Sequence, residues 1–297
     1  MHGPADKAGQ LAQEKKIRDQ LARIKYPIMV MSGKGGVGKS TVAVNLAYAL
    51  AMAGFQVGIM DVDIHGPNVP KMLGIEDRQF GGDQETIIPV QVNDHLKAAS
   101  IGLLGYNTDE ALIWRGPVKI GLIRQFLADV AWGDLDYLIF DTPPGTGDES
   151  LTLAQTVPGM AGAVVVTTPQ AVSILDSRKS LNFAGKLNLP ILGIVENMSG
   201  FVCPGCGTIT HIFKQGGGKA AADDLGVPFL GAIPLEPGVV EAGDSGMPFI
   251  AGNPESLTAR ALRHIIDGIS QSIAKLEAEG RYLPKPEPPP TGFRPER

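Results

Sequence analysis

Cysteine is nearly absent from this sequence, which has two cysteines among 297 residues. Two are too few for the disulfide frameworks that hold small secreted domains together. Long apolar runs are also lacking, so no segment reaches the length that a membrane-spanning helix needs. The first 23 residues are polar and charged, unlike a secretory signal. These absences predict a cytoplasmic protein that has no membrane partner.

An excess of positive charge is lacking as well. The chain has 26 Lys and Arg against 31 Asp and Glu, a formal net charge of −5. Proteins that bind nucleic acids usually carry a basic face or stripe, so we expect no nucleic-acid partner. The length allows one large domain or two small ones, each with a sizeable core.

Short apolar runs alternate with helical segments along most of the chain. Strands that alternate with helices indicate βαβ units, whose parallel sheet is covered on both faces. The sequence therefore predicts an α/β fold with a doubly wound, mainly parallel sheet flanked by helices. The predicted strands are Tyr26–Met31, Phe55–Met60, Tyr137–Phe140, Gly162–Thr167, Ile191–Val195 and Phe229–Ile233; the predicted helices are Val42–Ala53, 117–131, 148–156, 173–187, 216–225 and 255–279.

Three regions lie outside this alternation. Residues 7–24 mix apolar and charged side chains and predict an amphipathic helix, so residues 1–25 form a helical extension before a main domain at 26–283. The segment 74–100 predicts a loop with a small hairpin. Residues 284–297 are rich in proline and predict a disordered tail.

A phosphate-binding loop is the clearest motif. Gly33-Lys34-Gly35-Gly36-Val37-Gly38-Lys39-Ser40 matches G-x-x-x-x-G-K-[ST], with a predicted strand before it and a helix after it. Its glycines let successive N–H groups turn inward around an anion, and the helix adds its positive N-terminal end. We expect Lys39 to reach the β- and γ-phosphates of ATP, Ser40 to bind Mg²⁺ and Thr41 to contact the α-phosphate.

Acidic residues follow two of the predicted strands. Ligands bind at the carboxyl ends of strands in open α/β sheets, and a P-loop enzyme needs carboxylates near the metal and the attacking water. Asp141 ends an apolar strand and is expected to hold Mg²⁺ through a coordinated water. Asp63 is the first candidate for polarising the attacking water, and Asp61 is expected to assist on the Mg²⁺ side.

Asn197 follows the predicted strand Ile191–Val195. An asparagine amide can pair with the N6 and N7 atoms of adenine. A lone asparagine after a strand is more often a simple turn residue, so the residue by itself does not establish an adenine contact.

The loop resembles that of a known class of ATPases. Its extra lysine, Lys34, is typical of the deviant Walker A motif in SIMIBI-class P-loop ATPases, which include the nitrogenase iron protein, the arsenite-pump ATPase, MinD and ParA. Further segments resemble the Mrp/ApbC iron–sulfur carriers over residues 20–280. These segments are Asp61-Val62-Asp63-Ile64-His65-Gly66-Pro67-Asn68-Val69-Pro70, Trp114-Arg115-Gly116-Pro117, Asp141-Thr142-Pro143-Pro144-Gly145-Thr146-Gly147-Asp148, Glu196-Asn197-Met198-Ser199 and Cys203-Pro204-Gly205-Cys206-Gly207.

The resemblance implies roles for particular residues. Lys34 would cross a dimer interface to the phosphates of the partner subunit, Asn197 would contact adenine, and Asp63 would act in hydrolysis. Cys203 and Cys206 would hold a [4Fe–4S] cluster. The extra N-terminal domain of many bacterial members and the N-terminal cysteine cluster of some eukaryotic members have no counterpart here.

The two cysteines, Cys203 and Cys206, allow three interpretations when read without the resemblance. A thioredoxin-like dithiol needs a helix directly after the motif, but this motif lies in a Gly/Pro loop. Inert exposed thiols would be prone to oxidation. A metal site is the third interpretation, and zinc and [4Fe–4S] clusters each need four ligands. One chain offers two thiolates, or three ligands with His211, so a two-fold dimer is the arrangement that supplies four.

These features lead to one main hypothesis and two alternatives. The main hypothesis is an ATP-dependent homodimeric carrier that takes a [4Fe–4S] cluster from an assembly scaffold to apo-proteins. In it, ATP acts on the cluster through the segments after Asp63 and Asp141. The alternatives are a positioning ATPase of the MinD/ParA kind and a regulatory ATPase whose cysteines bind structural zinc.

Overall fold

The computed structural model describes residues 4–64, 66–83, 85–104 and 116–282. The predicted tail at 284–297 and the pair Trp114-Arg115 lie outside the described residues. The helices are α1 (Pro4–Leu21), α2 (Lys39–Met52), α3 (Val69–Leu73), η1 (Ile101–Leu103), α4 (Gly116–Asp129), α5 (Asp148–Thr156), α6 (Ala171–Lys186), α7 (Gly217–Leu225), α8 (Pro237–Asp244), α9 (Phe249–Gly252) and α10 (Leu257–Ala278).

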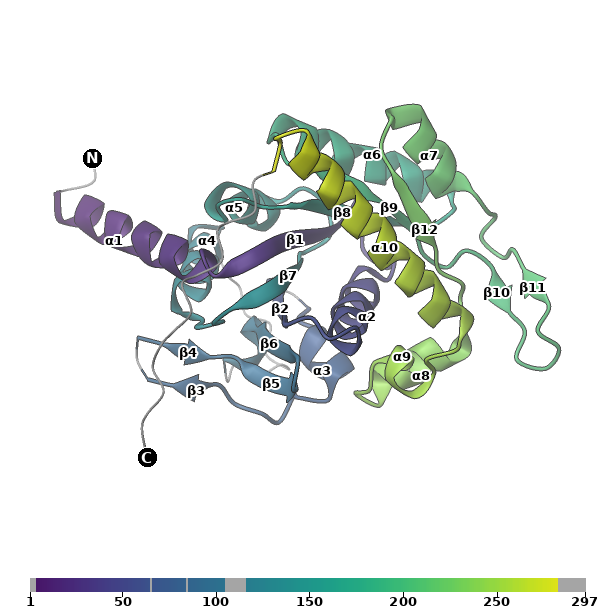
Figure 1. Cartoon of the computed structure of the whole chain (residues 1–297), viewed down its shortest axis with the longest axis horizontal. Coiled ribbons are helices and arrows are strands. Elements are labelled where there is room, and N and C mark those ends of the chain that lie inside the picture. The colour runs from purple at the N-terminus through teal and green to yellow at the C-terminus, as the bar shows by residue number, and fades with distance from the viewer. Residues whose placement is uncertain (1–3, 65, 84, 105–115, 283–297) are drawn as a thin grey trace.

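One eight-stranded sheet forms the centre of the molecule (Figure 1). Its strand order is β12-β9-β8-β1-β7-β2-β6-β5, and every pair is parallel except β5 with β6. These strands are β1 (Ile24–Ser32), β2 (Val57–Asp61), β5 (Val90–Asn93), β6 (Leu96–Ser100), β7 (Leu135–Asp141), β8 (Gly162–Thr167), β9 (Ile191–Glu196) and β12 (Phe229–Ala232). The predicted doubly wound, mainly parallel fold is confirmed.

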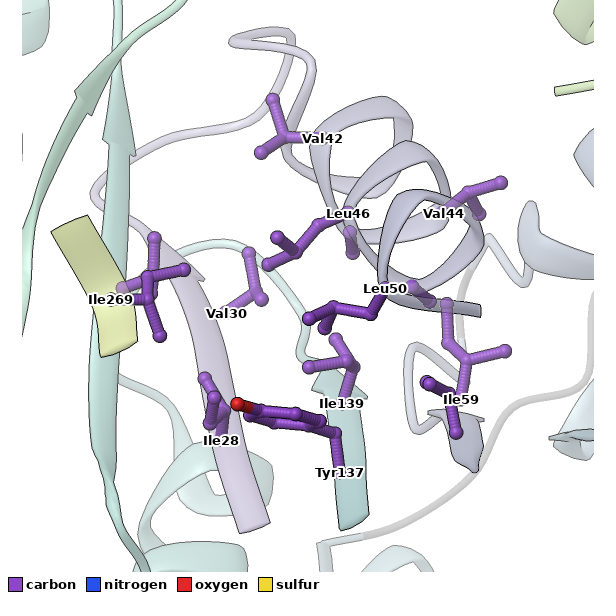
Figure 2. Packing of buried hydrophobic residues seen from close by; sticks show 14 of the residues in the cluster. Ile28, Val30, Val42, Val44, Leu46, Leu50, Ile59, Tyr137, Ile139 and Ile269 are labelled. Atoms are coloured by element: carbon purple, nitrogen blue, oxygen red, sulfur yellow. The ribbon is translucent and has the colours of Figure 1, made fainter. Parts of the chain in front are cut away.

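Alternate side chains of the central strands pack against helices on opposite faces. Ile28 and Val30 of β1 contact α2 and α10 on one face, whereas Met29 and Met31 join α1, α4 and α5 on the other. Figure 2 shows Leu46 of α2 over the first face, beside side chains of β1 and β7. Burying one such aliphatic side chain contributes about 1.5–3 kcal/mol. Both faces of the sheet are therefore covered, as continuous apolar strands require.

Two helix predictions were wrong in detail. Ile24 was placed in the N-terminal helix, but α1 ends at Leu21 and Ile24 pairs with Leu135 as the first residue of β1. The helix predicted from Val42 begins at Lys39, because the end of the phosphate-binding loop forms its first turn.

The segment 74–100 holds more sheet than the loop and small hairpin that were predicted. It contains the two-residue strands β3 (Gly81–Gly82) and β4 (Ile87–Ile88), and then β5 and β6, which extend the main sheet beyond β2. The Leu-Lys-Ala-Ala-Ser sequence of β6 has weak β propensity, and its pairing with β2 overrides that preference.

The end of α10 is tied to the beginning of β1. The Tyr282 hydroxyl donates to the backbone carbonyl of Lys25, and the Tyr26 hydroxyl donates to Glu277 at 3.1 Å. Burial raises the pKa of Tyr26 to about 12, with the carboxylate of Glu277 as the next cause. Burial raises the pKa of Tyr282 as well, so both tyrosines remain hydroxyl donors across the physiological pH range.

Candidate functional site

The phosphate-binding loop connects β1 to α2 at the carboxyl edge of the sheet. Gly36 and Gly38 have φ of 78° and 80°, which side-chain-bearing residues rarely adopt. Gly38 precedes α2 and no side chain caps the helix, so the first N–H groups of α2 face the loop. Gly33 serves a different need: a Cβ there would lie 2.1 Å from the carbonyl carbon of Asp176 in α6.

A cavity of about 680 Å³ opens over this loop. Its size lies within the range of about 300–1,000 Å³ that is typical of ligand sites. Its lining consists of Ser32, Lys34, Gly35, Gly36, Val37, Gly38, Lys39, Ser40, Thr41, Asp63, Gly66, Asn68, Met72, Lys119, Pro143, Pro144 and Glu149. The structure thus brings Lys34, Lys39 and Asp63 together around one cavity.

Lys39, which lines the cavity, forms a buried ion pair with Asp141, and its Nζ lies 3.2 Å from the Ser40 hydroxyl. Burial raises the pKa of Asp141, and the positive charge of Lys39 opposes that shift. The Oδ2 atom of Asp141 is buried and has no hydrogen-bond partner among the described residues. This oxygen and the Ser40 hydroxyl are the hard ligands that Mg²⁺ prefers, so the residues present fit the metal.

Asp61 lies beside Asp141, and its carboxylate holds the loop that follows β2. Its Oδ1 accepts from the Asp63 N–H at 3.0 Å, and its Oδ2 accepts from the Val69 N–H at 3.2 Å and the Ser100 hydroxyl at 3.1 Å. Complete burial raises the pKa of Asp61 to about 8, and the nearby charge of Asp141 adds to the shift. Both oxygens therefore bind the loop that positions Asp63, and a direct role for Asp61 at Mg²⁺ stays a prediction.

A smaller pocket of about 90 Å³ adjoins the phosphate-binding loop. Asn197 lines it and donates from Nδ2 to the carbonyl of Val37 at 2.9 Å. Asn45 and Thr258 line it too, and each has a buried side-chain oxygen without a partner among the described residues. The remaining lining is Gly38, Thr41, Val42, Met198, Ile233, Pro234, Leu235, Glu236, Val239, Val240 and Leu262. An apolar pocket with a few polar groups beside a phosphate site suits a nucleobase.

The two cysteines lie in the turn of a short hairpin that projects from the body of the molecule (Figure 1). Its strands are β10 (Phe201–Val202) and β11 (Ile209–Thr210), so the placement in a loop rather than before a helix is confirmed. Cys206 is exposed and Cys203 is half-buried. A hydrogen bond with the Thr208 hydroxyl is the main cause that lowers the pKa of the Cys206 thiol.

Within the described part of one chain, the cysteine pair has no third metal ligand. Among the described residues, no group of three or more His, Cys, Asp or Glu side chains could hold a metal ion. His211 therefore does not complete a site with Cys203 and Cys206, and neither cysteine lines either cavity.

Several residues of the site were missed in the sequence. Lys119 of α4 and Glu149 of α5 form an ion pair of 3.1 Å in the wall of the larger cavity, and no spacing in the chain indicates this contact. Ser100 ends a strand that was not predicted. Asn45 carried a usable signal, because it is a buried polar residue in an otherwise apolar stretch of helix.

Comparison with protein families places most of the chain in one of them. Residues 23–270 match the family described as ParA, the NUBPL iron-transfer P-loop NTPase. An iron-sulfur cluster carrier protein of Methanocaldococcus jannaschii is 55% identical over 238 residues, which are 80% of this chain and 82% of that protein. A cytosolic Fe-S cluster assembly factor NUBP2 homolog of Trichoplax adhaerens is 51% identical over 82% of this chain and 94% of that protein.

Solved structures agree with this assignment. A nucleotide-binding protein of Archaeoglobus fulgidus in complex with ADP has a TM-score of 0.70 and 38% identity, over 80% of this chain and 92% of that chain. The cell division ATPase MinD of Pyrococcus furiosus has a TM-score of 0.59 and 25% identity, over 83% of this chain and 99% of that chain. No helix in the described part of this chain is long and apolar enough to cross a membrane.

Proposed function

Since this chain belongs to the NUBPL iron-transfer P-loop NTPase family, we propose that it is an ATP-binding and ATP-hydrolysing carrier of [4Fe–4S] clusters. The observation that carries the proposal is the position of the cysteine hairpin, whose first strand is bonded to the wall of the nucleobase pocket. The N–H of Val202 donates to the carbonyl of Leu235 at 3.2 Å, and Leu235 lines that pocket. The turn that would bind the cluster and the pocket that would hold the nucleobase are thus joined through one segment.

The residues of the larger cavity would bind and orient the nucleotide. Lys39 leaves Asp141 for the β- and γ-phosphates, the N–H groups of the loop surround the phosphate oxygens, and Asp63 orients the attacking water. Mg²⁺, held by Ser40 and Asp141 with Asp61 close by, would neutralise phosphate charge. Hydrolysis is expected to be slow, because the main task of the protein is transport of its cargo.

The cluster is the cargo, and two copies of the chain would hold it. A [4Fe–4S] cluster needs four thiolates, and each chain offers Cys203 and Cys206 from an exposed turn. A homodimer with two-fold symmetry brings the same turn to one point twice. Ile209 and Ile212 are exposed beside the turn and would exclude water from the joined site. Lys34 would reach across the same dimer to the phosphates of the partner subunit.

The proposal is tested by anaerobic reconstitution of the full chain with iron and sulfide. We expect a brown protein with broad visible absorption, four iron and four sulfide per two chains, and the mass of a dimer. Cys203→Ala and Cys206→Ala should lose the colour, whereas Thr210→Ala, at an exposed position in the same hairpin, should keep it. A colourless protein that retains zinc would overturn the cluster assignment and favour a structural zinc knuckle.

The same proposal extends to partners and location. An assembly scaffold would supply the cluster, apo-proteins in the cytoplasm would receive it, and the carrier would need neither a membrane nor a nucleic acid. Transfer is measured by mixing the loaded carrier with an apo-ferredoxin and following the spectrum of the acceptor. A MinD/ParA-like positioning role would instead predict binding to vesicles or DNA, and it gives Cys203 and Cys206 no task.

A further inference from the structure

Glu196 is a buried carboxylate at the end of β9 that lines neither cavity and lies outside the cysteine hairpin. It is 1% exposed and directly precedes Asn197. Its Oε1 accepts from the Ser199 hydroxyl at 2.5 Å and from the Gly216 N–H at 3.1 Å, and its Oε2 accepts from the Gly218 N–H at 2.6 Å. All three donors belong to segments that enter or leave the cysteine hairpin.

These contacts close the hairpin at its base. Ser199 begins the excursion that carries Cys203 and Cys206, and Gly216 ends it at the start of α7. A Cβ on Gly218 would lie 3.0 Å from the Cβ of Glu196, so glycine is what allows α7 to approach this closely. One carboxylate therefore fixes both ends of the segment that holds the thiols.

The same stretch of chain is attached to the nucleotide site. Asn197 donates to the carbonyl of Val37 in the phosphate-binding loop at 2.9 Å. The next residue, Met198, has φ of 57°, a conformation that few side-chain-bearing residues adopt and that turns the chain sharply toward the hairpin. One hydrogen bond thus joins the loop at Val37 to a short, constrained turn that begins at Glu196.

A second set of bonds joins this turn to the wall of the nucleobase pocket. The Ile233 N–H donates to the carbonyl of Glu196 at 2.8 Å, the Ser199 N–H donates to the carbonyl of Ile233 at 2.9 Å, and the Leu235 N–H donates to the carbonyl of Gly200 at 2.8 Å. Ile233 and Leu235 line the pocket. The base and the phosphates of a nucleotide would therefore both act on the segment that Glu196 anchors.

We propose that Glu196 is a positioning residue that couples nucleotide binding to the geometry of the cysteine hairpin. The inference rests on the proposed function for its meaning, because it supplies a route from ATP to the cluster-binding thiols. This route runs on the nucleobase side, through residues 196–200 and 233–235, in addition to the segments after Asp63 and Asp141. A buried carboxylate suits the task, because its charge-assisted hydrogen bonds to fixed N–H groups are strong and directional.

The test compares Glu196→Gln with the wild-type chain, both free of metal, by hydrogen exchange with and without ADP. A glutamine places an amide NH₂ group at one of the two oxygen positions, where a backbone N–H now donates to Glu196, so at least one of the three hydrogen bonds is lost. In the wild type, ADP should slow exchange of the Val202, Cys203 and Gly207 amides at least about fivefold, a typical size for coupling between sites. In Glu196→Gln, ADP should still protect the phosphate-binding loop, and the effect on the hairpin should disappear.

Two further variants keep the test decisive. Asp223→Asn makes the same acid-to-amide change at an exposed ion pair of α7 and should behave as the wild type. Ser199→Ala removes the hydroxyl that donates to Glu196 and keeps the carboxylate, so ADP should slow exchange of its hairpin amides less than in the wild type. If Glu196→Gln does not fold, the comparison of Ser199→Ala with the wild type tests the proposal.

Three results would overturn the proposal. The first is a wild-type hairpin whose exchange does not respond to ADP, and the second is a Ser199→Ala hairpin that responds as fully as the wild type. The third is a Glu196→Gln hairpin in which ADP slows exchange by the same factor as in the wild type, whether or not the substitution raises both rates, because a purely structural role would leave that factor unchanged. Because no metal is present, these outcomes are independent of cluster reconstitution. Failure of the carrier proposal and failure of this coupling are therefore distinguishable.

Discussion

Gly33→Ala is expected to destabilise the protein strongly, although the change adds a single methyl group. The new Cβ would lie 2.1 Å from the carbonyl carbon of Asp176, 2.3 Å from its oxygen and 2.5 Å from the nitrogen of Ser177. These are main-chain atoms of α6 and cannot rotate away, so α6 or the end of β1 must move. Overpacking of this kind costs about 1–3 kcal/mol, or more when backbone shifts, and we expect a loss of about 3 kcal/mol.

Gly35→Ala is the matched control in the same loop. The nearest atom to its new Cβ would be the Cγ of Pro144 at 3.9 Å, an ordinary contact, and Gly35 does not have positive φ. Alanine at a compatible glycine position changes stability by less than about 1 kcal/mol. The two variants therefore separate crowding against α6 from the general effect of replacing a loop glycine.

The measurement is urea unfolding followed by far-UV circular dichroism, with ADP affinity measured on the folded proteins. Gly33→Ala should unfold at clearly lower urea with an unchanged slope, because the surface exposed on unfolding is the same. Its ADP affinity should fall as well, since a displaced loop no longer aims its N–H groups at the phosphates. Equal unfolding midpoints for Gly33→Ala and Gly35→Ala would refute the reasoning.

Two other predictions concern charge. Lys39→Ala leaves the buried carboxylate of Asp141 without its cation, and breaking a buried ion pair lowers the free energy of unfolding by about 3–5 kcal/mol. Adding Asp141→Asn should restore much of that stability in urea unfolding. A double variant as unstable as Lys39→Ala alone would contradict this. In the metal-free protein, the lowered pKa of Cys206 makes it a thiolate at lower pH than an ordinary cysteine, so its alkylation by iodoacetamide should rise early in a pH series. Thr208→Val removes the main cause and should move that rise to higher pH, whereas coincident profiles would show that Thr208 has no part in it.

Local patterns predicted what depends on neighbouring residues in the chain. The phosphate-binding loop, Asp141 at the end of its strand and the loop position of the cysteines follow from a few consecutive residues, so the sequence was sufficient to place them in the fold. The two positive-φ glycines of the loop, Gly36 and Gly38, also match the anion-binding geometry that its pattern implies.

Contacts between distant segments were not predictable in this way. Lys39 pairs with a residue 102 positions away, and Glu196 binds N–H groups about 20 positions later. The need for Gly33 comes from α6, which no pattern within the loop reveals. The same limit explains the missed strand β6, whose alanines become sheet only because β2 provides a partner. Residue type alone says little about which distant atoms will surround a side chain.

The tie between Tyr282 and Lys25 has a practical consequence for labelling the molecule. It places the end of the last helix at the amino end of β1, whereas the phosphate-binding loop begins at the opposite end of that nine-residue strand. At a rise of about 3.3 Å per residue, the two positions are separated by roughly 26 Å. A fluorophore or surface tether attached close to Glu277 would therefore lie far from the phosphate-binding loop, and Figure 1 shows the hairpin β10–β11 well apart from this end of α10. Two chains could then be brought together at their hairpins while each carries its label on the far side.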